Sequence, residues 1–373
     1  MHRMILCVAC ALAMTSAHAA NWVAAWGAAP DSDGPSLHRQ SVRQQLRISA
    51  SGTRVRIRLS NAYGNGALTL GPVQLGRAGG APRPVLFDGR PNVTIPKGED
   101  VLSDPLELAL APLDLLDVSI YVEDGAATLH SDARHSALIS GAPPTSSDSR
   151  YFLSEVQVDA APGARAIVVV GDSISDGDGS TPNRNARWPD ALASRLHGTS
   201  IAVVNSGISG NRLLNDGPVG SSMLQRVQRD AFDKPGVKWL VLEAGLNDIG
   251  LADETGIPGG PVTADAIIAG MQQVIAQAHA RGIKVWGATL TPYGGAQQPL
   301  RHNAQAEAKR LAVNAWIRGS RSFDRVLDFD AAVRDPGDRT RILPALDSGD
   351  HVHPNDAGYR ALAAAVPLRF FQR

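Results

Sequence analysis

The first half of the chain carries the alternating pattern of β-strands. Charged and apolar residues alternate over residues 54–59, and residues 67–75 and 115–122 are short segments rich in apolar and β-branched side chains. Glycine and proline fall between these segments, and no stretch sustains a helical period with capping residues. Several short strands separated by turns predict an antiparallel β-sandwich or jelly-roll-like domain over residues 20–160. Within it, we expect an edge strand at residues 22–26.

After about residue 160, apolar runs alternate with helical segments. We expect strands at residues 166–170, 201–205, 238–242, 284–288 and 326–328, and helices at residues 188–196, 222–232, 264–281, 303–319 and 356–365. This βα alternation predicts a mostly parallel sheet with helices on both faces over residues 161–373. Small and polar residues at 141–150 are typical of a linker, so we expect a domain boundary there.

The composition fits a globular protein of two domains. A chain of 373 residues is too long for one average domain, and an apolar content of 43% is enough to bury a sizeable core. Lysine plus arginine equal aspartate plus glutamate at 36 each. Because nucleic-acid binding requires a basic excess or a dense basic stripe, we expect no nucleic-acid partner. Arg54, Arg56 and Arg58 share one face of a predicted strand, which we interpret as a solvated face.

Residues 1–19 have the features of a secretory signal peptide. Arg3 supplies the positive charge, residues 4–14 form a short apolar core, and Ala17 and Ala19 satisfy the small-residue rule for cleavage. The apolar core is too short to cross a bilayer, and no other run is suited to a membrane span. The segment therefore predicts export to the periplasm or the medium.

Cleavage there would leave a mature protein that begins at Ala20. Both cysteines, Cys7 and Cys10, lie before this point, so the mature chain is expected to contain no disulfide. A lipid anchor on Cys10 is the weaker alternative, because the residues before it lack the usual leucine.

Candidate chemistry begins at Ser173, directly after the predicted strand at residues 166–170. Open α/β sheets bind ligands at the carboxyl ends of their strands. A serine hydroxyl becomes an effective nucleophile when a base takes its proton and a third group orients that base. Asp350 and His353 precede the last predicted helix and can supply the acid and the base. The alternative is that Ser173 only caps a helix.

Two other loops are expected at the same edge of the sheet and offer hydrogen-bond donors. Residues 205–211 and 245–248 follow the next two strands. The Gly210 amide and the Asn247 side chain can donate to a developing negative charge without themselves being charged. Gly207 competes with Gly210 for this role.

The remaining polar residues of these motifs have structural interpretations. Asp172 and Asp248 are expected to hold loops through bonds from side chain to backbone. Asp347 is the weaker candidate for the orienting acid, because it lies six residues from His353. We place His351 at the surface, with a position in the substrate cleft as the alternative.

Four segments together resemble the ordered motifs of the SGNH (GDSL-type) hydrolase family. They are Gly171-Asp-Ser-Ile174, Ile208-Ser-Gly210, Gly245-Leu-Asn-Asp248 and Asp350-His-Val-His353, and they span the chain from about residue 166 to its end. Ile174 stands where the family usually has leucine. The resemblance implies a flavodoxin-like, three-layer α/β/α catalytic domain, here preceded by a β-rich domain as in secreted bacterial members.

The same resemblance implies the site residues. Ser173 would be the nucleophile, His353 the base and Asp350 its orienting acid. The oxyanion hole would consist of the Ser173 amide, the Gly210 amide and the Asn247 side-chain amide.

Other chemistries fit the sequence less well. The Gly-x-Ser-x-Gly elbow of α/β-hydrolases fails because Ser175 occupies the position of the second glycine. Dinucleotide and Walker motifs are absent from the expected positions, and no paired histidines or cysteines suggest a metal site. We therefore expect no cofactor and no metal.

The prediction is a serine esterase acting on short acyl or acetyl esters, including those on polysaccharides. A lipase or lysophospholipase-type acylhydrolase, an acyltransferase and a non-catalytic carbohydrate-binding protein remain alternatives. The expected partner is the ester substrate, with no stable membrane insertion, and the oligomeric state stays open.

Overall fold

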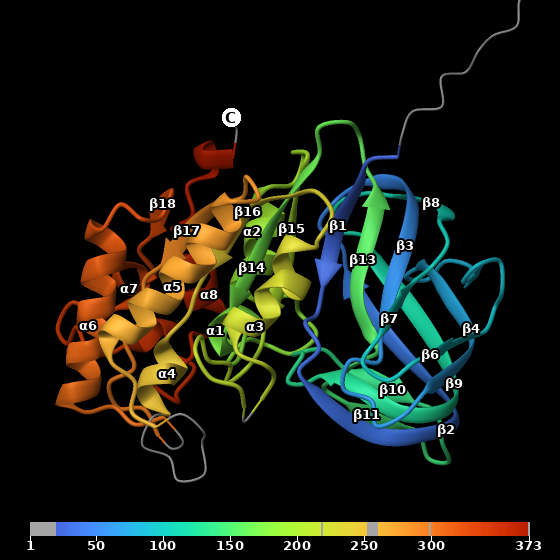
Figure 1. Cartoon of the computed structure of the whole chain (residues 1–373), viewed down its shortest axis with the longest axis horizontal. Coiled ribbons are helices and arrows are strands. Elements are labelled where there is room, and N and C mark those ends of the chain that lie inside the picture. Colours follow the sequence, from blue (N-terminus) through green and yellow to red (C-terminus); the bar gives the residue numbers. More distant parts are fainter. Residues whose placement is uncertain (1–19, 218, 252–259, 298–299, 372–373) are drawn as a thin grey trace, which may run out of the picture.

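The computed structural model describes residues 20–217, 219–251, 260–297 and 300–371, and the predicted signal peptide lies outside these ranges. Figure 1 shows a β-rich half and an α/β half side by side. Strands β1 (Trp22–Gly27) and β13 (Leu153–Asp159) form the part of the β-rich half nearest the α/β half. The predicted contrast between a strand-rich N-terminal region and an α/β C-terminal region is confirmed.

Two antiparallel sheets make up the β-rich half. One has the order β1-β13-β3-β7, with β8 also paired to β3; the other has the order β11-β10-β2-β9-β4-β5, with β12 on β9 and β6 on β4. Besides β1 and β13, the strands are β2 (Ser32–Arg47), β3 (Gly52–Ser60), β4 (Leu68–Arg77), β5 (Arg83–Val85), β6 (Val93–Ile95), β7 (Asp100–Leu102), β8 (Leu106–Leu110), β9 (Leu115–His130), β10 (Ala137–Ile139), β11 (Thr145–Ser147) and β12 (Arg150–Tyr151). Alternate side chains of both sheets, among them Ile57, Val156, Val118 and Ile120, meet in one hydrophobic core.

Two expectations for this half are wrong. Residues 141–150 are not a domain boundary, because β11 and the first residue of β12 lie there and extend the larger sheet; the chain instead passes to the α/β half between Asp159 and Arg165. The arginine face of β3 is not simply solvated, because the side chains are half-buried and lie against β13. Arg54 pairs with Asp159 at 2.6 Å, and Arg58 lies 3.4 Å from Glu155.

The α/β half is built on a five-stranded sheet in which every pairing is parallel. Its order is β15-β14-β16-β17-β18, with β14 (Arg165–Gly171), β15 (Ile201–Gly207), β16 (Val237–Leu242), β17 (Lys284–Ala288) and β18 (Arg325–Leu327). β14 lies between β15 and β16, and the apolar run at its centre has no exposed surface. A strand that is covered on both faces needs apolar side chains on both, and this run supplies them.

Helices pack around this sheet in two groups. α5 contacts both α3 and α6, and α8 contacts both α2 and α7. The helical segments are α1 (Ser173–Asp176), α2 (Trp188–Arg195), α3 (Met223–Val227), the π-helical η1 (Gln228–Phe232), α4 (Leu246–Gly250), α5 (Ala264–His279), α6 (Ala304–Gly319), α7 (Phe329–Val333), η2 (Pro344–Leu346), α8 (Asp356–Ala364) and η3 (Leu368–Phe371). The helix expected at residues 222–232 is therefore divided between α3 and η1.

The two halves are joined by buried contacts. Ala24 of β1 belongs to the core of the α/β half, and the Ser49 hydroxyl donates to Val203 O of β15 at 2.8 Å. Lys234, just after η1, forms an ion pair of 3.0 Å with Glu155 of β13, and both side chains are buried. These contacts bring β1 and β13 against the α/β half at the side where β15 forms the sheet edge.

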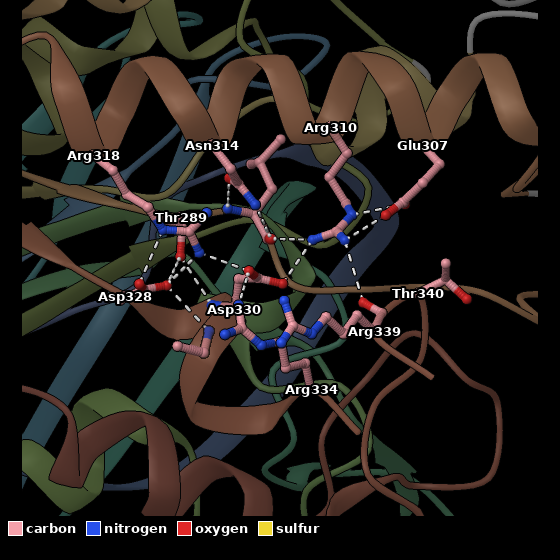
Figure 2. Close-up of polar contacts among 12 residues, drawn as sticks. Thr289, Glu307, Arg310, Asn314, Arg318, Asp328, Asp330, Arg334, Arg339 and Thr340 are labelled. Carbon is pink, nitrogen blue, oxygen red and sulfur yellow. Dashed lines mark hydrogen bonds and ion pairs between the residues drawn. The ribbon is translucent and has the colours of Figure 1, made fainter. Parts of the chain in front are cut away.

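An ionic network ties α6 to the ends of β17 and β18. Figure 2 shows side chains of α6 pointing toward the segment that begins α7. Asp330 is buried there and accepts hydrogen bonds from Arg310 at 2.8 Å, Arg318 at 2.6 Å and Arg334 at 2.9 Å. Its backbone N–H donates to Thr289 Oγ1 at 2.9 Å. One carboxylate therefore binds two guanidinium groups of α6 and that of the residue that follows α7.

Candidate active site

Ser173 lies at the carboxyl end of the central strand. β14 ends at Gly171, where an added Cβ would collide with the Ser175 side chain, so the chain can turn directly into α1. Asp172 caps this helix, because its Oδ1 accepts from Ile174 N at 3.1 Å. The expected structural role of Asp172 is therefore confirmed, while Ser173 is the first helical residue and not the cap.

The structure brings Ser173, His353 and Asp350 into one hydrogen-bonded chain. His353 Nε2 lies 2.8 Å from Ser173 Oγ, and His353 Nδ1 lies 2.6 Å from Asp350 Oδ2. Because the carboxylate can only accept, Nδ1 carries a proton and the neutral ring presents Nε2 as an acceptor to the serine hydroxyl. Ser173 is 6% exposed, so its hydroxyl is almost removed from bulk water.

Local backbone bonds hold Asp350 in place for His353. Its Oδ1 accepts from Val352 N at 2.9 Å and from His353 N at 2.8 Å. Asp347 pairs instead with His351, at 2.6 Å between Oδ2 and Nδ1, so the weaker candidate for the orienting acid contacts the other histidine. The His351 side chain is 39% exposed, in agreement with its expected position at the surface.

The carboxylates around His353 favour its charged form. Burial opposes this charge, but the hydrogen bond to Asp350 and the charges of Asp178 and Asp350 raise the pKa of His353 above the ordinary 6.5. Burial likewise opposes ionisation of Asp350, yet its bond to His353 and the backbone donors lower the pKa of this carboxyl. Asp178 Oδ2 lies 3.9 Å from His353 Nε2, the nitrogen that faces the serine.

The loop after β15 is a tight turn built around Gly210. Asn211 N donates to Ile208 O at 3.1 Å, and Gly210 has a φ of 73° at the third position. These features define a type II turn, in which glycine avoids the strain of a positive φ. Residues 208–211, which contain the expected oxyanion donor Gly210, are named the oxyanion loop. At Gly207 an added Cβ would collide with the backbone of Ser175 and Asp176, so this glycine allows α1 to approach β15.

Asn247 and Asp248 connect the loop after β16 to the loop after β15. The buried Asn247 Nδ2 donates to Asn211 O at 3.0 Å, which leaves its second hydrogen available for another acceptor. Asp248 accepts from Leu213 N at 2.8 Å and Leu214 N at 3.0 Å, so its expected role in holding a loop is confirmed.

Sequence reasoning missed Arg226, a buried arginine that lies beneath these loops. Its guanidinium donates to Gly171 O at 3.0 Å, Ser206 O at 2.7 Å and Asn211 Oδ1 at 2.9 Å, and pairs with Asp230 at 3.2 Å. It therefore ties the ends of β14 and β15 to the oxyanion loop. An arginine in the middle of a helical pattern gave no local signal of this role.

Sequence reasoning also missed Glu243 and Asp178. Glu243 follows β16 and accepts from the Ser175 hydroxyl; burial and the nearby Asp172 raise the pKa of this carboxyl. Asp178 accepts from the Ser209 hydroxyl, and its position five residues after Ser173 was the only available signal. Glu243 therefore contacts the helix that carries Ser173, and Asp178 contacts the oxyanion loop.

The described residues contain no group of three or more histidine, cysteine, aspartate or glutamate side chains arranged to hold a metal ion. In the same residues, no helix is long and apolar enough to cross a membrane.

Residues 169–361 match the model of the GDSL-like Lipase/Acylhydrolase family. No curated protein matches the chain.

Solved structures that resemble the chain include three esterases or lipases. A GDSL-like lipase from Bacteroides thetaiotaomicron is 19% identical, with 57% of this chain and 90% of that chain covered and a TM-score of 0.43. A carbohydrate esterase family 2 enzyme with a carbohydrate binding domain from Corynascus thermopiles is 16% identical, with 93% of each chain covered and a TM-score of 0.41. A variant of an acetyl-xylooligosaccharide esterase from Geobacillus Stearmophilus is 23% identical, with 55% and 93% covered and a TM-score of 0.41.

Proposed function

Because the chain belongs to the GDSL-like lipase/acylhydrolase family and is a carboxylic ester hydrolase, we propose that it works as a serine esterase through an acyl-enzyme on Ser173. The observation that carries this proposal is the pair of contacts that His353 makes, 2.8 Å to Ser173 Oγ and 2.6 Å to Asp350. The parallel strand order of the α/β half supports a flavodoxin-like catalytic domain, and the shared core of the two antiparallel sheets supports a β-sandwich before it.

The reaction proceeds in two halves. Ser173 Oγ attacks the ester carbonyl carbon while His353 Nε2 takes the serine proton. The tetrahedral intermediate collapses, the alcohol leaves with the proton from His353, and the acyl group stays on Ser173. Water then attacks the acyl-enzyme with His353 as base, which releases the acid and restores the serine.

Negative charge on the former carbonyl oxygen is stabilised by fixed donors. The Ser173 and Gly210 amides and the second hydrogen of the Asn247 amide form the oxyanion hole in this proposal. The bond from Asn247 to Asn211 O supports it, because it fixes the amide group next to the oxyanion loop before substrate arrives.

We expect Asn247→Ala to lower kcat by about 10²–10³-fold with little change in KM, because this donor strengthens its bond only as charge develops. The measurement is steady-state hydrolysis of p-nitrophenyl acetate. Asn92→Ala, which changes an exposed asparagine of the β-rich half, is the control and should retain full activity. A loss of less than tenfold in Asn247→Ala would remove Asn247 from the oxyanion hole.

The acid limb of the pH profile should lie above the ordinary histidine value of 6.5. His353 acts as a base only when neutral, and its raised pKa means that protonation begins to stop the reaction at a higher pH. Asp178→Asn removes a negative charge 3.9 Å from Nε2, so kcat/KM should persist to lower pH in this variant. Asp347→Asn, whose carboxylate contacts His351, is the control and should leave the acid limb in place. Equal acid limbs in wild type and Asp178→Asn would contradict the prediction.

The substrate we propose is a short acyl ester, such as an acetyl ester, of a polar alcohol that includes polysaccharide hydroxyls. Asp178 lies 3.9 Å from His353 Nε2 with its side chain 23% exposed, and such a polar group suits a hydroxylated alcohol better than a long acyl chain. We also propose that residues 1–19 direct export, on the sequence features given above.

A series of p-nitrophenyl esters of increasing chain length, together with acetate release from acetylated xylan, tests this proposal. Activity that falls with chain length and includes acetate release supports the short-acyl esterase. Preference for long chains would favour the lipase alternative, and binding of xylan without turnover of any ester would favour the carbohydrate-binding alternative.

A further inference from the structure

A buried histidine from the β-rich half reaches the helix that carries Ser173. His130 is the last residue of β9 and is 5% exposed. Its Nε2 lies 3.1 Å from Asp176 Oδ1, and its Nδ1 lies 3.0 Å from Ala29 O, with Asp31 Oδ2 at 3.5 Å. His130 therefore connects two segments of the β-rich half to the end of α1.

Both ring nitrogens of His130 face groups that can only accept. A carbonyl oxygen faces Nδ1 and a carboxylate oxygen faces Nε2, so both contacts are satisfied as hydrogen bonds only by the doubly protonated ring. Burial opposes this charge, but Asp176 and Asp31 raise the pKa of His130 to about 10. A buried imidazolium thus lies beside the Asp176 carboxylate.

Asp176 contacts both His130 and the oxyanion loop. Its Oδ1 faces His130, while its Oδ2 accepts from Ser209 N at 3.0 Å. Burial raises the pKa of Asp176, and the nearby imidazolium, helped by the charge of Arg187, favours the ionised carboxylate and its stronger bond to Ser209. The positive charge of His130 therefore strengthens the hydrogen bond between Ser209 N and Asp176.

Ser209 is the second residue of the turn, and the peptide that follows it contains the Gly210 N–H. The bond from Ser209 N to Asp176 fixes the position of Ser209, to which this central peptide of the turn is attached. Donors in an oxyanion hole must be held within fractions of an ångström of their working positions, and a misplacement of 1 Å can cost about 10²-fold in rate.

We infer that His130 is a positioning residue for catalysis, which acts through Asp176 and Ser209 to hold the Gly210 amide in position. The inference rests on the proposed esterase function. It also assigns a role to the β-rich half, which would complete the scaffold of the oxyanion hole and would not serve only as a binding module.

The test compares full-length wild type with His130→Ala, His130→Gln and Asp176→Asn. We measure kcat and KM for p-nitrophenyl acetate, the inhibition constant of phenylboronic acid, which forms a tetrahedral adduct on serine, and the thermal unfolding midpoint. His130→Ala should lower kcat by about 10- to 100-fold and weaken boronic acid by a similar factor, with KM within about twofold. His130→Gln, which keeps a donor for Asp176, should recover most of kcat.

Asp176→Asn should also lower kcat, because an amide oxygen accepts a weaker hydrogen bond from Ser209 N than a carboxylate oxygen does. The double variant His130→Ala/Asp176→Asn should lower kcat by no more than the larger of the two single effects, because both changes interrupt the same chain of contacts to Ser209. Asp176→Asn, which leaves His130 in place, keeps the inference testable if His130→Ala does not fold.

Lys234→Met is the matched control, because it removes another buried ion pair between the halves, 3.0 Å from Glu155, without touching the oxyanion loop. It should lower the unfolding midpoint but leave kcat and boronic acid binding unchanged. The inference is overturned if the folded His130 and Asp176 variants keep wild-type kcat, or if Lys234→Met loses as much kcat as they do. A wild type that turns over no ester would instead overturn the proposed function.

Discussion

Replacing Ser173 with alanine is expected to lower kcat for ester hydrolysis by about 10⁴- to 10⁶-fold. The variant keeps the oxyanion donors but has no oxygen to attack the carbonyl, so His353 has no serine proton to take. Because Asp172 and not Ser173 caps the helix, the fold should survive the change. The measurement is hydrolysis of p-nitrophenyl acetate together with release of acetate from acetylated xylan.

Ser180→Ala provides a matched control for this experiment. Ser180 is buried seven residues further along the chain, and within the described residues its hydroxyl has no hydrogen-bond partner. The same loss of one oxygen atom should therefore leave kcat unchanged there. Residual activity in Ser173→Ala within tenfold of wild type would show that another group is the nucleophile.

The largest effect on stability is expected for Asp330→Ala. Three guanidinium groups, from Arg310, Arg318 and Arg334, share the Asp330 carboxylate, and the aspartate side chain is 3% exposed. Breaking a buried ion pair from one side leaves uncompensated charge, which typically costs about 3–5 kcal/mol. We expect the free energy of unfolding, measured with urea at neutral pH, to fall by this amount.

A surface ion pair gives the comparison. Arg39 and Glu123 lie 3.3 Å apart with side chains 69% and 45% exposed, so Glu123→Ala should change the free energy of unfolding by less than about 1 kcal/mol. A change in Asp330→Ala as small as this would mean that Glu307 and Asp328 neutralise the arginines without Asp330.

The strands and helices of the α/β half could be predicted because each leaves a local period in the sequence. The run in β14 is apolar at every position since both faces of the strand are covered, and α5 and α6 show apolar positions at helical spacing. The linker prediction at residues 141–150 failed for the opposite reason. Small polar residues suit exposed edge strands as well as loops, and only pairing with β10 and β9 reveals β11 and β12 as strands.

The candidate site was predictable where its parts are local. Asp350 and His353 are three residues apart, and one turn aligns the carboxylate with the ring. Ser173 stands at the end of a recognisable central strand. By contrast, Arg226 and Glu243 act through groups distant in the sequence, and no pattern of spacing links them to the serine.

Periodicity and short motifs depend on residues that are near neighbours in the chain. They were therefore enough to predict the strand-rich and α/β regions, their order, and the candidate nucleophile, base and acid. Only the tertiary structure decided which distant charges meet. The strand pattern was clear only to Val122, yet β9 continues to His130, which enters the α/β half beside Asp176. Burial demands a partner for each charge, and that partner is chosen by how the two halves pack.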